Sequence, residues 1–373
     1  MGVRRLWHLI EEVHQAPKVN PPSDTILLVD LFGAYFCSVR YNFFALNNNE
    51  WVYNAIDKFL KLRFTDKAKV EIYIDGGRTK EKEKTTKARL ATAKRQLVAA
   101  EAIVSDIESK ADGGETATSA THRRCSRYLL QSFILTAEHR RALTHGLKSR
   151  GWNAVMAKGE ADLAIRARCE ELKQQNNQFA VVTSDSDLLA HQAVPMIYRP
   201  FRRGFRQYDV DQCAVDLGLS RRQLTALAIV SRNDYSSGPF CLDIGINIEI
   251  IKELATPSTS CHVLILSSTS SIMKENNLTH LMISSTIGKS VSNIIDDYLK
   301  SDTVKNRFKK TSLEIEGLYQ PSRKVFLLGS ETPIDDNESN EGAKIYKAAK
   351  ALSLRYKNAK TIMAANSKAK REE

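Results

Sequence analysis

The sequence predicts an α/β fold in which helices flank a mainly parallel central sheet. Three apolar, partly β-branched runs lie between helix-prone segments, at Thr25–Val29, Lys69–Ile74 and Gln178–Thr183. Strands that alternate with helices are typical of a parallel sheet. An aspartate follows each run within two residues. Because ligands bind outside the carboxyl ends of such strands, these acids indicate a ligand-binding site rather than ordinary surface residues.

Length, charge and cysteine usage narrow the class of protein. A chain of 373 residues suffices for one large domain or two smaller ones. The net charge of +12 favours a polyanionic partner such as DNA, RNA or an anionic membrane surface, although it also fits a basic protein with no such role. The six cysteines form no CxxC pair, so they indicate no zinc site and fit a reducing compartment.

The sequence contains no recognisable signal for secretion or membrane insertion. Charges interrupt the apolar residues of the first segment, Leu6 stands where a myristoylation site expects Ser or Thr, and no apolar run is as long as a membrane span. We therefore expect a soluble intracellular protein with no membrane partner.

Helix signals lie on both sides of the strand runs. Residues 3–13 carry an amphipathic pattern, and Glu160 with Asp162 opens a helix that continues through Ala167. Ser220 and Gln223 have the spacing of a capping box before an apolar helix at 224–230. A turn is expected at 234–238.

The segment from residue 76 to residue 150 has a different composition, with 16 Lys and Arg against 8 Asp and Glu. It is helix-prone from Lys80 to Lys110, breaks at 111–114 and resumes near His122. We predict two basic helices with a flexible tip, inserted between two strands. The alternative is an ordinary solvated helical hairpin.

The last third of the chain gives weaker signals. Beyond about residue 255 the sequence becomes rich in Ser and Thr, notably at 258–271, which favours mixed structure. From about Asp335 it is polar and rich in lysine, which predicts either a helix or a partly disordered tail.

Seven acids are the candidate site residues. Gathered within a few ångströms they would repel one another, and divalent cations remove that difficulty. Mg²⁺ prefers oxygen ligands and keeps several waters, and two ions about 4 Å apart serve an in-line phosphoryl displacement. The candidate ligands are Asp30, Asp75, Glu160, Asp162, Asp185, Asp187 and Asp234.

Spacing tests this grouping. Glu160 and Asp162 would point about 200° apart inside a helix, so they share a site only if Glu160 lies at or before the first helical turn. Asp185 and Asp187 face one side if the chain stays extended after the strand. A single acid after a strand is more often a helix cap or turn residue, and Asp187 in particular has the position of a cap for a helix at Leu188.

Several motifs together resemble the flap endonucleases and XPG-type 5′-nucleases, which have a PIN-like fold. Ile74-Asp75-Gly-Gly with Lys82 and Arg89 resembles that family's DG…K…R segment, and Gly159-Glu-Ala-Asp162 resembles its EAE motif. The remaining motifs are Met1-Gly-Val-Arg-Arg-Leu-Trp7, Val29-Asp30, Val182-Thr-Ser-Asp-Ser-Asp-Leu188 and Leu227-Ala-Ile-Val-Ser-Arg-Asn-Asp-Tyr-Ser-Ser-Gly238. The resemblance spans roughly residues 1–255.

The resemblance implies a hydrolase with two Mg²⁺ ions, for which Mn²⁺ can substitute, acting on branched or end-bearing DNA. One ion would be held by Asp75, Glu160, Asp162 and Asp185. The other would be held by Asp185, Asp187 and Asp234, with Asp30 acting partly through water.

The resemblance also implies roles for residues outside the acids. Lys82 and Arg89 would lie at the base of a helical arch, contact the scissile phosphate and stabilise its developing charge. Residues 80–150 would form that arch, through which a single strand passes. Phe36 would stack on a base, and Gly2 would lie near the active site.

The sequence departs from the family pattern at three glycine positions. Arg5 replaces the glycine before Leu6, and Ser231-Arg-Asn-Asp234 lacks the glycine of the GxDY segment. The Gly-x-Gly hairpin that grips duplex backbone with a potassium ion is reduced to Gly245 within 242–247. We find no clamp-binding peptide.

The expected organisation is a PIN-like nuclease domain at 1–255, with an N-terminal part at 1–90, the arch at 80–150 and an internal part at 151–255. A divergent C-terminal region at 256–334 and a basic tail at 335–373 follow. The expected function is a structure-specific 5′-nuclease of DNA repair or replication, monomeric and nuclear. The alternatives are the same chemistry on RNA or as a single-strand 5′-exonuclease, and a catalytically silent relative that binds nucleic acid or protein.

Overall fold

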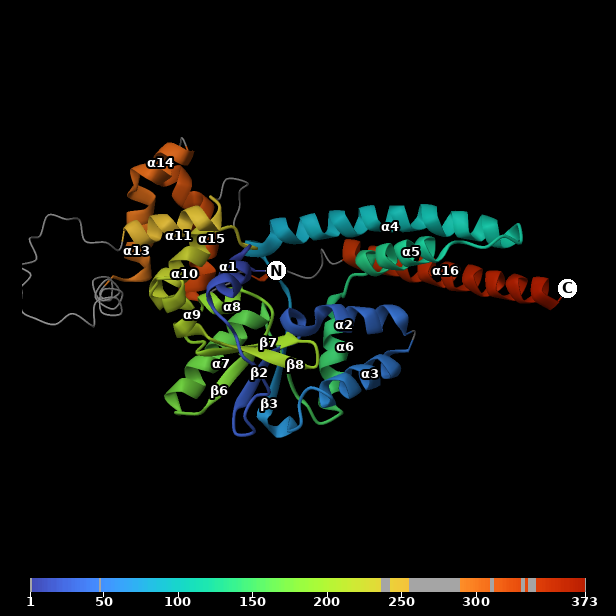
Figure 1. The fold of residues 1–373 in the computed structure, drawn as a ribbon, viewed down its shortest axis with the longest axis horizontal. Helices are drawn as coiled ribbons and strands as arrows, with labels where there is room; N and C mark the ends of the chain where they lie inside the picture. The colour runs from blue at the N-terminus through green and yellow to red at the C-terminus, as the bar shows by residue number, and fades with distance from the viewer. Residues whose placement is uncertain are drawn as a thin grey trace, which may run out of the picture. The chain divides into compact units, whose positions relative to one another are not determined.

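The computed structural model describes residues 2–46, 48–235, 242–254, 289–308, 312–329, 333–334 and 340–372. The chain divides into two compact units (Figure 1). Unit 1 comprises 1–34, 68–73 and 161–332, and unit 2 comprises 35–67, 74–160 and 333–373. The first boundary falls inside helix α2 (Leu31–Ala45), at Tyr35, where the backbone leaves helical geometry.

The sheet of unit 1 is mainly parallel, as predicted. Its strand order is β1-β8-β7-β6-β2-β3, in which β2, β3, β6 and β7 run parallel while β8 and β1 add antiparallel pairs at one edge. The three predicted strand runs are confirmed to within a residue at each end. The bounds are β1 (Lys18–Val19), β2 (Ile26–Asp30), β3 (Val70–Ile74, preceded by the 3₁₀ helix η1 at Lys67–Lys69), β6 (Phe179–Val182), β7 (Met196–Phe201) and β8 (Gly204–Asp209).

Helices flank this sheet, and one apolar core joins them to it. Leu28 and Val181 of the sheet belong to the same buried cluster as Ile165 and Leu227 of the helices. The predicted capping box is confirmed, since the Ser220 hydroxyl accepts from the Gln223 amide and Gln223 Oε1 accepts from the Ser220 amide. The helices are α1 (Leu6–Val13), α7 (Ala161–Gln174), α8 (Asp187–Ala190), α9 (Val210–Asp216), α10 (Arg221–Val230), α11 (Ile244–Glu253), α13 (Val291–Lys300), α14 (Asp302–Phe308) and α15 (Ser312–Leu328).

The part of the last third that the structure describes within unit 1 packs against the apolar core of that unit. Tyr298 of α13 and Tyr319 and Phe326 of α15 share a buried cluster with Leu227 and Ile251. These helices therefore pack against α10, the helix that precedes the segment carrying Asp234. The Ser/Thr-rich run at 258–271 and most of the predicted turn at 234–238 lie outside the described residues.

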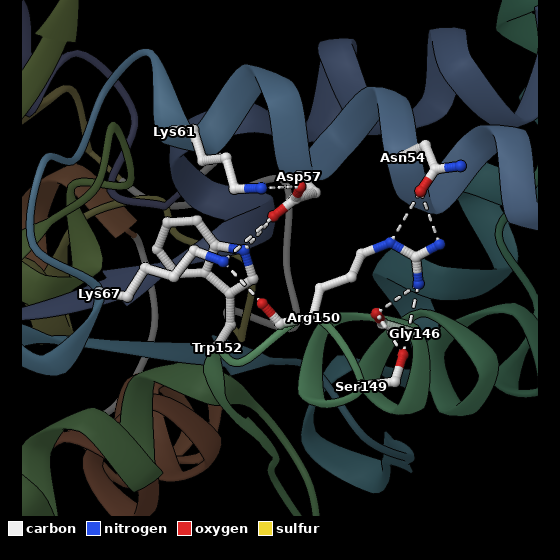
Figure 2. Close-up of polar contacts among 8 residues, drawn as sticks. All are labelled: Asn54, Asp57, Lys61, Lys67, Gly146, Ser149, Arg150 and Trp152. Atoms are coloured by element: carbon white, nitrogen blue, oxygen red, sulfur yellow. Dashed lines mark hydrogen bonds and ion pairs between the residues drawn. The ribbon is translucent and has the colours of Figure 1, made fainter.

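A polar network stabilises unit 2 around the buried carboxylate of Asp57 (Figure 2). Trp152 Nε1 donates to Asp57 Oδ1 at 2.9 Å, and Lys61 pairs with Oδ2 at 2.6 Å. Burial would raise the pKa of Asp57, but the hydrogen bonds from Lys61 and Trp152 and the charge of Lys67 outweigh burial and hold this pKa below its usual value. Arg150 adds bonds to Asn54 of helix α3 (Asn49–Lys61) and to the Gly146 carbonyl of helix α6 (Ala137–Lys148), so the network links these two helices.

The other elements of unit 2 include a short two-stranded sheet in which β4 and β9 pair antiparallel. They are α3 (Asn49–Lys61), β4 (Arg78–Thr79), the 3₁₀ helix η2 (Lys80–Lys82), α4 (Glu83–Asp112), α5 (Ser119–Ser132), α6 (Ala137–Lys148), β5 (Asn153–Met156), β9 (Pro333–Ile334) and α16 (Asn340–Glu372).

The predicted lysine-rich tail is the long helix α16, and it packs on α4 and α5 as a three-helix coil (Figure 1). Buried side chains recur along α16 at alternating spacings of four and three, which is the heptad pattern of coiled-coil seams. Lys94 near Glu341, and Glu108 paired with Arg355 at 2.6 Å, show that α4 and α16 run parallel. The seam of α16 consists of Ile345, Ala349, Leu352, Tyr356, Ala359 and Met363.

This coil limits where a nucleic-acid strand passes. Ile103 and Val104 of α4, Cys125 and Leu129 of α5 and Leu352 of α16 form one buried apolar cluster. The space between the two predicted arch helices is therefore filled by side chains along this stretch. The passage for a strand that the family resemblance implies cannot run between α4 and α5 there.

Three of the four cysteines that the structure describes are buried. Cys125, Cys169 and Cys213 are buried and Cys37 is exposed, while the other two cysteines lie outside the described residues. Burial raises the pKa of Cys169 and Cys213 to about 12, which makes both thiols inert at neutral pH. Over the described ranges, none of the helices has both the length and the apolar character needed to cross a bilayer.

The coil predicts a contrast between two leucines of α16. Leu352 is 4% exposed within the seam, whereas Leu354 is 54% exposed. We expect Leu352→Ala to lower the free energy of unfolding by about 2–4 kcal/mol because it leaves a cavity. Leu354→Ala should change it by less than about 0.5 kcal/mol. Urea denaturation followed by circular dichroism measures both, and equal losses would contradict the packing of α16.

Candidate metal centre

The carboxyl ends of β2 and β6 bring the first candidate acid into the site. In the parallel register Val29 pairs with Val182, so the next residues, Asp30 and Thr183, lie side by side. The Thr183 hydroxyl donates to Asp30 Oδ2 at 2.9 Å, and the Gly33 amide donates to Asp30 Oδ1 at 2.8 Å. Both oxygens of this buried carboxylate are thus oriented by the protein, which fits the predicted role of Asp30 through water.

The segment from Thr183 to Asp187 is held as a tight turn. The Asp185 amide donates to the Thr183 hydroxyl at 2.9 Å, and the Asp187 amide donates to Asp185 Oδ1 at 3.2 Å. The Ser184 amide donates to the Gly33 carbonyl, and Trp7 Nε1 donates to the Ser184 carbonyl at 2.9 Å. The turn therefore presents Asp185 and Asp187 from a fixed backbone.

Three of the seven candidate acids converge. One carboxylate oxygen from each of Asp162, Asp185 and Asp187 lies within 4.8 Å of the other two. All three side chains are less than a tenth exposed. Asp187 is the first residue of α8 rather than its N-cap, which is Ser186, so the cap alternative is wrong.

The electrostatics of this triad point to a cation. Asp162 and Asp187 lie in the first turns of α7 and α8, where helix dipoles offset part of their charge. Three carboxylates so close and so buried still repel one another, and a divalent cation is the partner that removes the repulsion. A donor set made only of carboxylate oxygens fits Mg²⁺, which coordinates oxygen and retains water.

Gly2 lies against the triad. It has a left-handed φ of 88°, and a Cβ there would approach Asp185 Oδ1 to 2.0 Å and the Ser186 hydroxyl oxygen to 2.6 Å. Only glycine fits this position without displacing the Asp185 carboxylate. This contact places Gly2 beside Asp185, and its role at an active site stays a prediction.

Asp234 is carried by a segment that buried amides hold in place. Asn233 Nδ2 donates to the Ala228 carbonyl at 2.7 Å, and Ser322 of α15 donates to Asn233 Oδ1 at 3.0 Å. Asn247 Nδ2 donates to Ser231, and Tyr298 of α13 donates to Asn247 Oδ1 at 2.6 Å. Asp234 lines a pocket with Gly2 and Ser186, next to the triad.

The other two candidate acids belong to unit 2. The Gly76 amide donates to the Gly159 carbonyl at 2.7 Å, which places Asp75 and Glu160 on neighbouring backbone. Lys82 Nζ donates to Glu160 Oε2 at 2.9 Å, and Lys82 is 7% exposed. Glu160 lies just before α7, the position that the spacing argument requires of it.

The remaining predicted residues lie in varied surroundings. Arg89 is exposed on α4, and Phe36 is half-buried on α2 with the Arg40 guanidinium 5.0 Å from its ring centre. Gly245 is the second residue of α11, and its amide donates to Asp243 Oδ1 at 3.0 Å. The retained glycine of the hairpin segment thus has its amide bonded within the protein.

Sequence reasoning missed the residues that orient the acids. Thr183, Gly33, Asn233 and Asn247 contribute no charge, so nothing in a search for ligands singles them out. The position of Thr183 directly after a strand and two residues before Asp185 was the available signal.

Residues 151–234 match the family model described as the XPG I-region. The match contains five of the seven candidate acids, namely Glu160, Asp162, Asp185, Asp187 and Asp234, and includes the whole triad. The matched residues make up less than a quarter of the chain, and over them the chain is similar to this region of the XPG family. No curated protein matches the chain at a significant level.

The chain also matches solved structures, two of which are described here. The catalytic core of Rad2 in complex with DNA substrate has 15% identity and a TM-score of 0.44, covering 86% of this chain and 100% of that chain. Human GEN1 in complex with Holliday junction DNA has 16% identity and a TM-score of 0.44, covering 90% of this chain and 68% of that chain. Because both TM-scores lie below 0.5, the similarity to a known family rests on the XPG I-region.

The departure at Arg5 gives a test of backbone strain. Arg5 has φ 68°, the left-handed conformation that glycine adopts freely, and its side chain pairs with exposed Asp243 at 3.0 Å. Both Arg5→Gly and Arg5→Ala lose the ion pair, so their difference reports the backbone alone. We expect the glycine variant to be about 1 kcal/mol more stable than the alanine variant in urea denaturation. Equal stabilities would refute the left-handed conformation.

Proposed function

We propose that this protein is a divalent-metal-dependent nuclease that hydrolyses phosphodiester bonds of DNA, with a structure-specific 5′ activity as in the superfamily. The observation that carries the proposal is the buried triad Asp162, Asp185 and Asp187 inside the XPG I-region. A role in DNA repair or replication in the nucleus is part of the proposal and follows from the superfamily resemblance.

The proposed ligands are those that the sequence predicts. Asp162, Asp185, Asp187 and Asp234 come from unit 1, with Asp30 acting through water. Asp75 and Glu160 are proposed to complete the set on the strength of the sequence, in which Glu160 stands two residues before Asp162. When bound, two Mg²⁺ ions supply an activated water and stabilise the departing oxygen of an in-line displacement.

The protein's own groups orient these ligands before the reaction. Thr183 and Gly33 fix the Asp30 carboxylate, and the amide of Asp187 fixes Asp185. Lys82 holds Glu160 and brings a buried positive charge next to a proposed ligand. A cation in that position suits stabilisation of charge that develops on a phosphate. Arg89 and Phe36 are proposed to contact the strand.

A second candidate is the same chemistry on RNA or on single-stranded 5′ ends. Gly245, the retained glycine of the duplex-gripping segment, donates its amide to Asp243, so this amide does not offer a bond to a duplex phosphate. This favours substrates whose duplex part is not required.

Cleavage of end-labelled substrates tests the proposal directly. We would compare 5′-flap, single-stranded and duplex DNA and matched RNA, each with Mg²⁺ and with EDTA. Metal-dependent cutting near the flap junction supports the first candidate, and cutting of RNA or single strands alone supports the second. Binding without any cutting would identify a catalytically silent relative.

Asp185→Ala should remove cleavage, by at least about two orders of magnitude, while nucleic-acid binding persists, because it deletes a metal ligand and no phosphate contact. The matched control is Asp24→Ala, an exposed acid just before the opposite end of strand β2. Steady-state cleavage and anisotropy binding measure the two effects. Unchanged cleavage in the Asp185 variant would overturn the site.

Lys82→Ala should lower the turnover rate more than it weakens substrate binding, because its charge serves the reacting phosphate. Lys58→Ala, an exposed lysine of α3 in the same unit, is the control and should leave both constants unchanged. Separate measurement of kcat and KM decides the point. A rise in KM alone would make Lys82 a positioning residue for substrate.

A further inference from the structure

A pocket of about 390 Å³ adjoins the triad within unit 1. Its lining runs from Gly2 to Trp7 on one side and from Arg232 to Asp234 on the other, with Ser186 between them. The Arg4 amide donates to the Arg232 carbonyl at 2.8 Å, which holds the two segments together. Because Gly2 and Ser186 also contact or flank Asp185, the pocket continues directly from the proposed metal centre.

Three arginines line this pocket, and two of them stand where the superfamily pattern has glycine. Arg5 replaces the glycine before Leu6, and Arg232 replaces the glycine of the GxDY segment. These positions lie 227 residues apart in the sequence, so their convergence is visible only in the fold. Both positions therefore bring a cationic side chain to the lining of the pocket.

The charge balance of the lining is positive. Arg4, Arg5 and Arg232 carry three positive charges and Asp234 one negative charge, which leaves +2. Arg5 is shared with Asp243, outside the lining, which reduces the balance to +1. Neither Arg4 nor Arg232 pairs with a carboxylate in the part of the chain that the structure describes, and both are exposed.

The helix that begins at the pocket adds to the preference for an anion. Helix α1 starts at Leu6, has no acid in its first turn and receives no side-chain cap from Arg5. Its N-terminal dipole therefore favours negative charge at the pocket. Trp7, which lines the pocket, is fixed by its bond to the Ser184 carbonyl and by Arg199, 4.7 Å from its ring centre. The recess is therefore cationic, with Trp7 held in place at its edge.

We propose that this pocket, which we call the arginine pocket, binds a phosphate group of the nucleic-acid strand adjacent to the bond that is cut. Guanidinium groups match phosphate oxygens in bidentate geometry, and several of them around one recess select phosphate. The position of this phosphate next to the cut bond rests on the proposed nuclease function. Binding of the phosphate to the pocket does not require cleavage. The phosphate is either a terminal 5′-phosphomonoester or an internal phosphodiester.

Binding in EDTA tests the proposal without any cleavage. The full chain is titrated against fluorescein-labelled single-stranded DNA, with a 5′-phosphate or a 5′-hydroxyl, over a range of salt concentrations. We compare the wild type, Arg232→Gln and the Arg4→Gln/Arg232→Gln double variant. The control is Arg307→Gln, which changes an exposed arginine of α14 outside the pocket.

Loss of one phosphate contact should reduce the slope of log K against log salt by about 0.7 for a single strand, and the double variant should lose about 1.4. Reduction with the 5′-phosphate substrate alone assigns the pocket to the terminal group, and reduction with both substrates assigns it to the internal backbone. An unchanged slope, or an equal change in Arg307→Gln, would overturn the proposal. If no substrate is cleaved but the salt slope still depends on Arg4 and Arg232, the proposed function is wrong. The phosphate-binding role of the arginine pocket would still stand.

Discussion

Mutual repulsion among buried carboxylates is the constraint around which the described part of unit 1 is arranged. Asp162, Asp185 and Asp187 come from two chain segments, and each is largely removed from water. Such a group is costly to assemble unless a cation joins it, so a scaffold that nevertheless assembles it must be stiff. The stiffness comes from parallel pairing of β2 with β6, from the Thr183 hydroxyl between Asp30 and Asp185, and from the core beneath them.

The helices of the last third extend this stiffness to Asp234. A segment without regular structure carries Asp234, and its conformation depends on Asn233 and Asn247. Ser322 and Tyr298, from helices that the superfamily motifs do not reach, satisfy the acceptor oxygens of these two amides. A buried amide with unsatisfied partners would be costly, so the divergent helices and the acid-bearing segment depend on each other.

Sequence reasoning recovered the features that depend on local pattern. Apolar runs ending in acids gave the strands, and Ser220 with Gln223 gave a capped helix. It left open whether the tail is helical. The seam positions Ala349, Tyr356 and Ala359 are not strongly apolar residues, so the heptad pattern is hard to recognise in a lysine-rich segment. The groups that orient the acids, such as Thr183, became visible only with strand register, which no local pattern specifies.

The three-helix coil of unit 2 determines where the basic residues of this unit can contact a polyanion. The apolar seams of α4, α5 and α16 meet inside the coil, so the cations occupy its outside. Some of them serve the fold, since Lys350 and Lys357 donate to carbonyls at the end of α2 and Arg355 pairs with Glu108. Arg123, Arg124 and Arg127 remain exposed on α5, which has no acid of its own. A polyanion attracted by this unit therefore meets its outer faces, where binding depends on salt and carries no sequence preference.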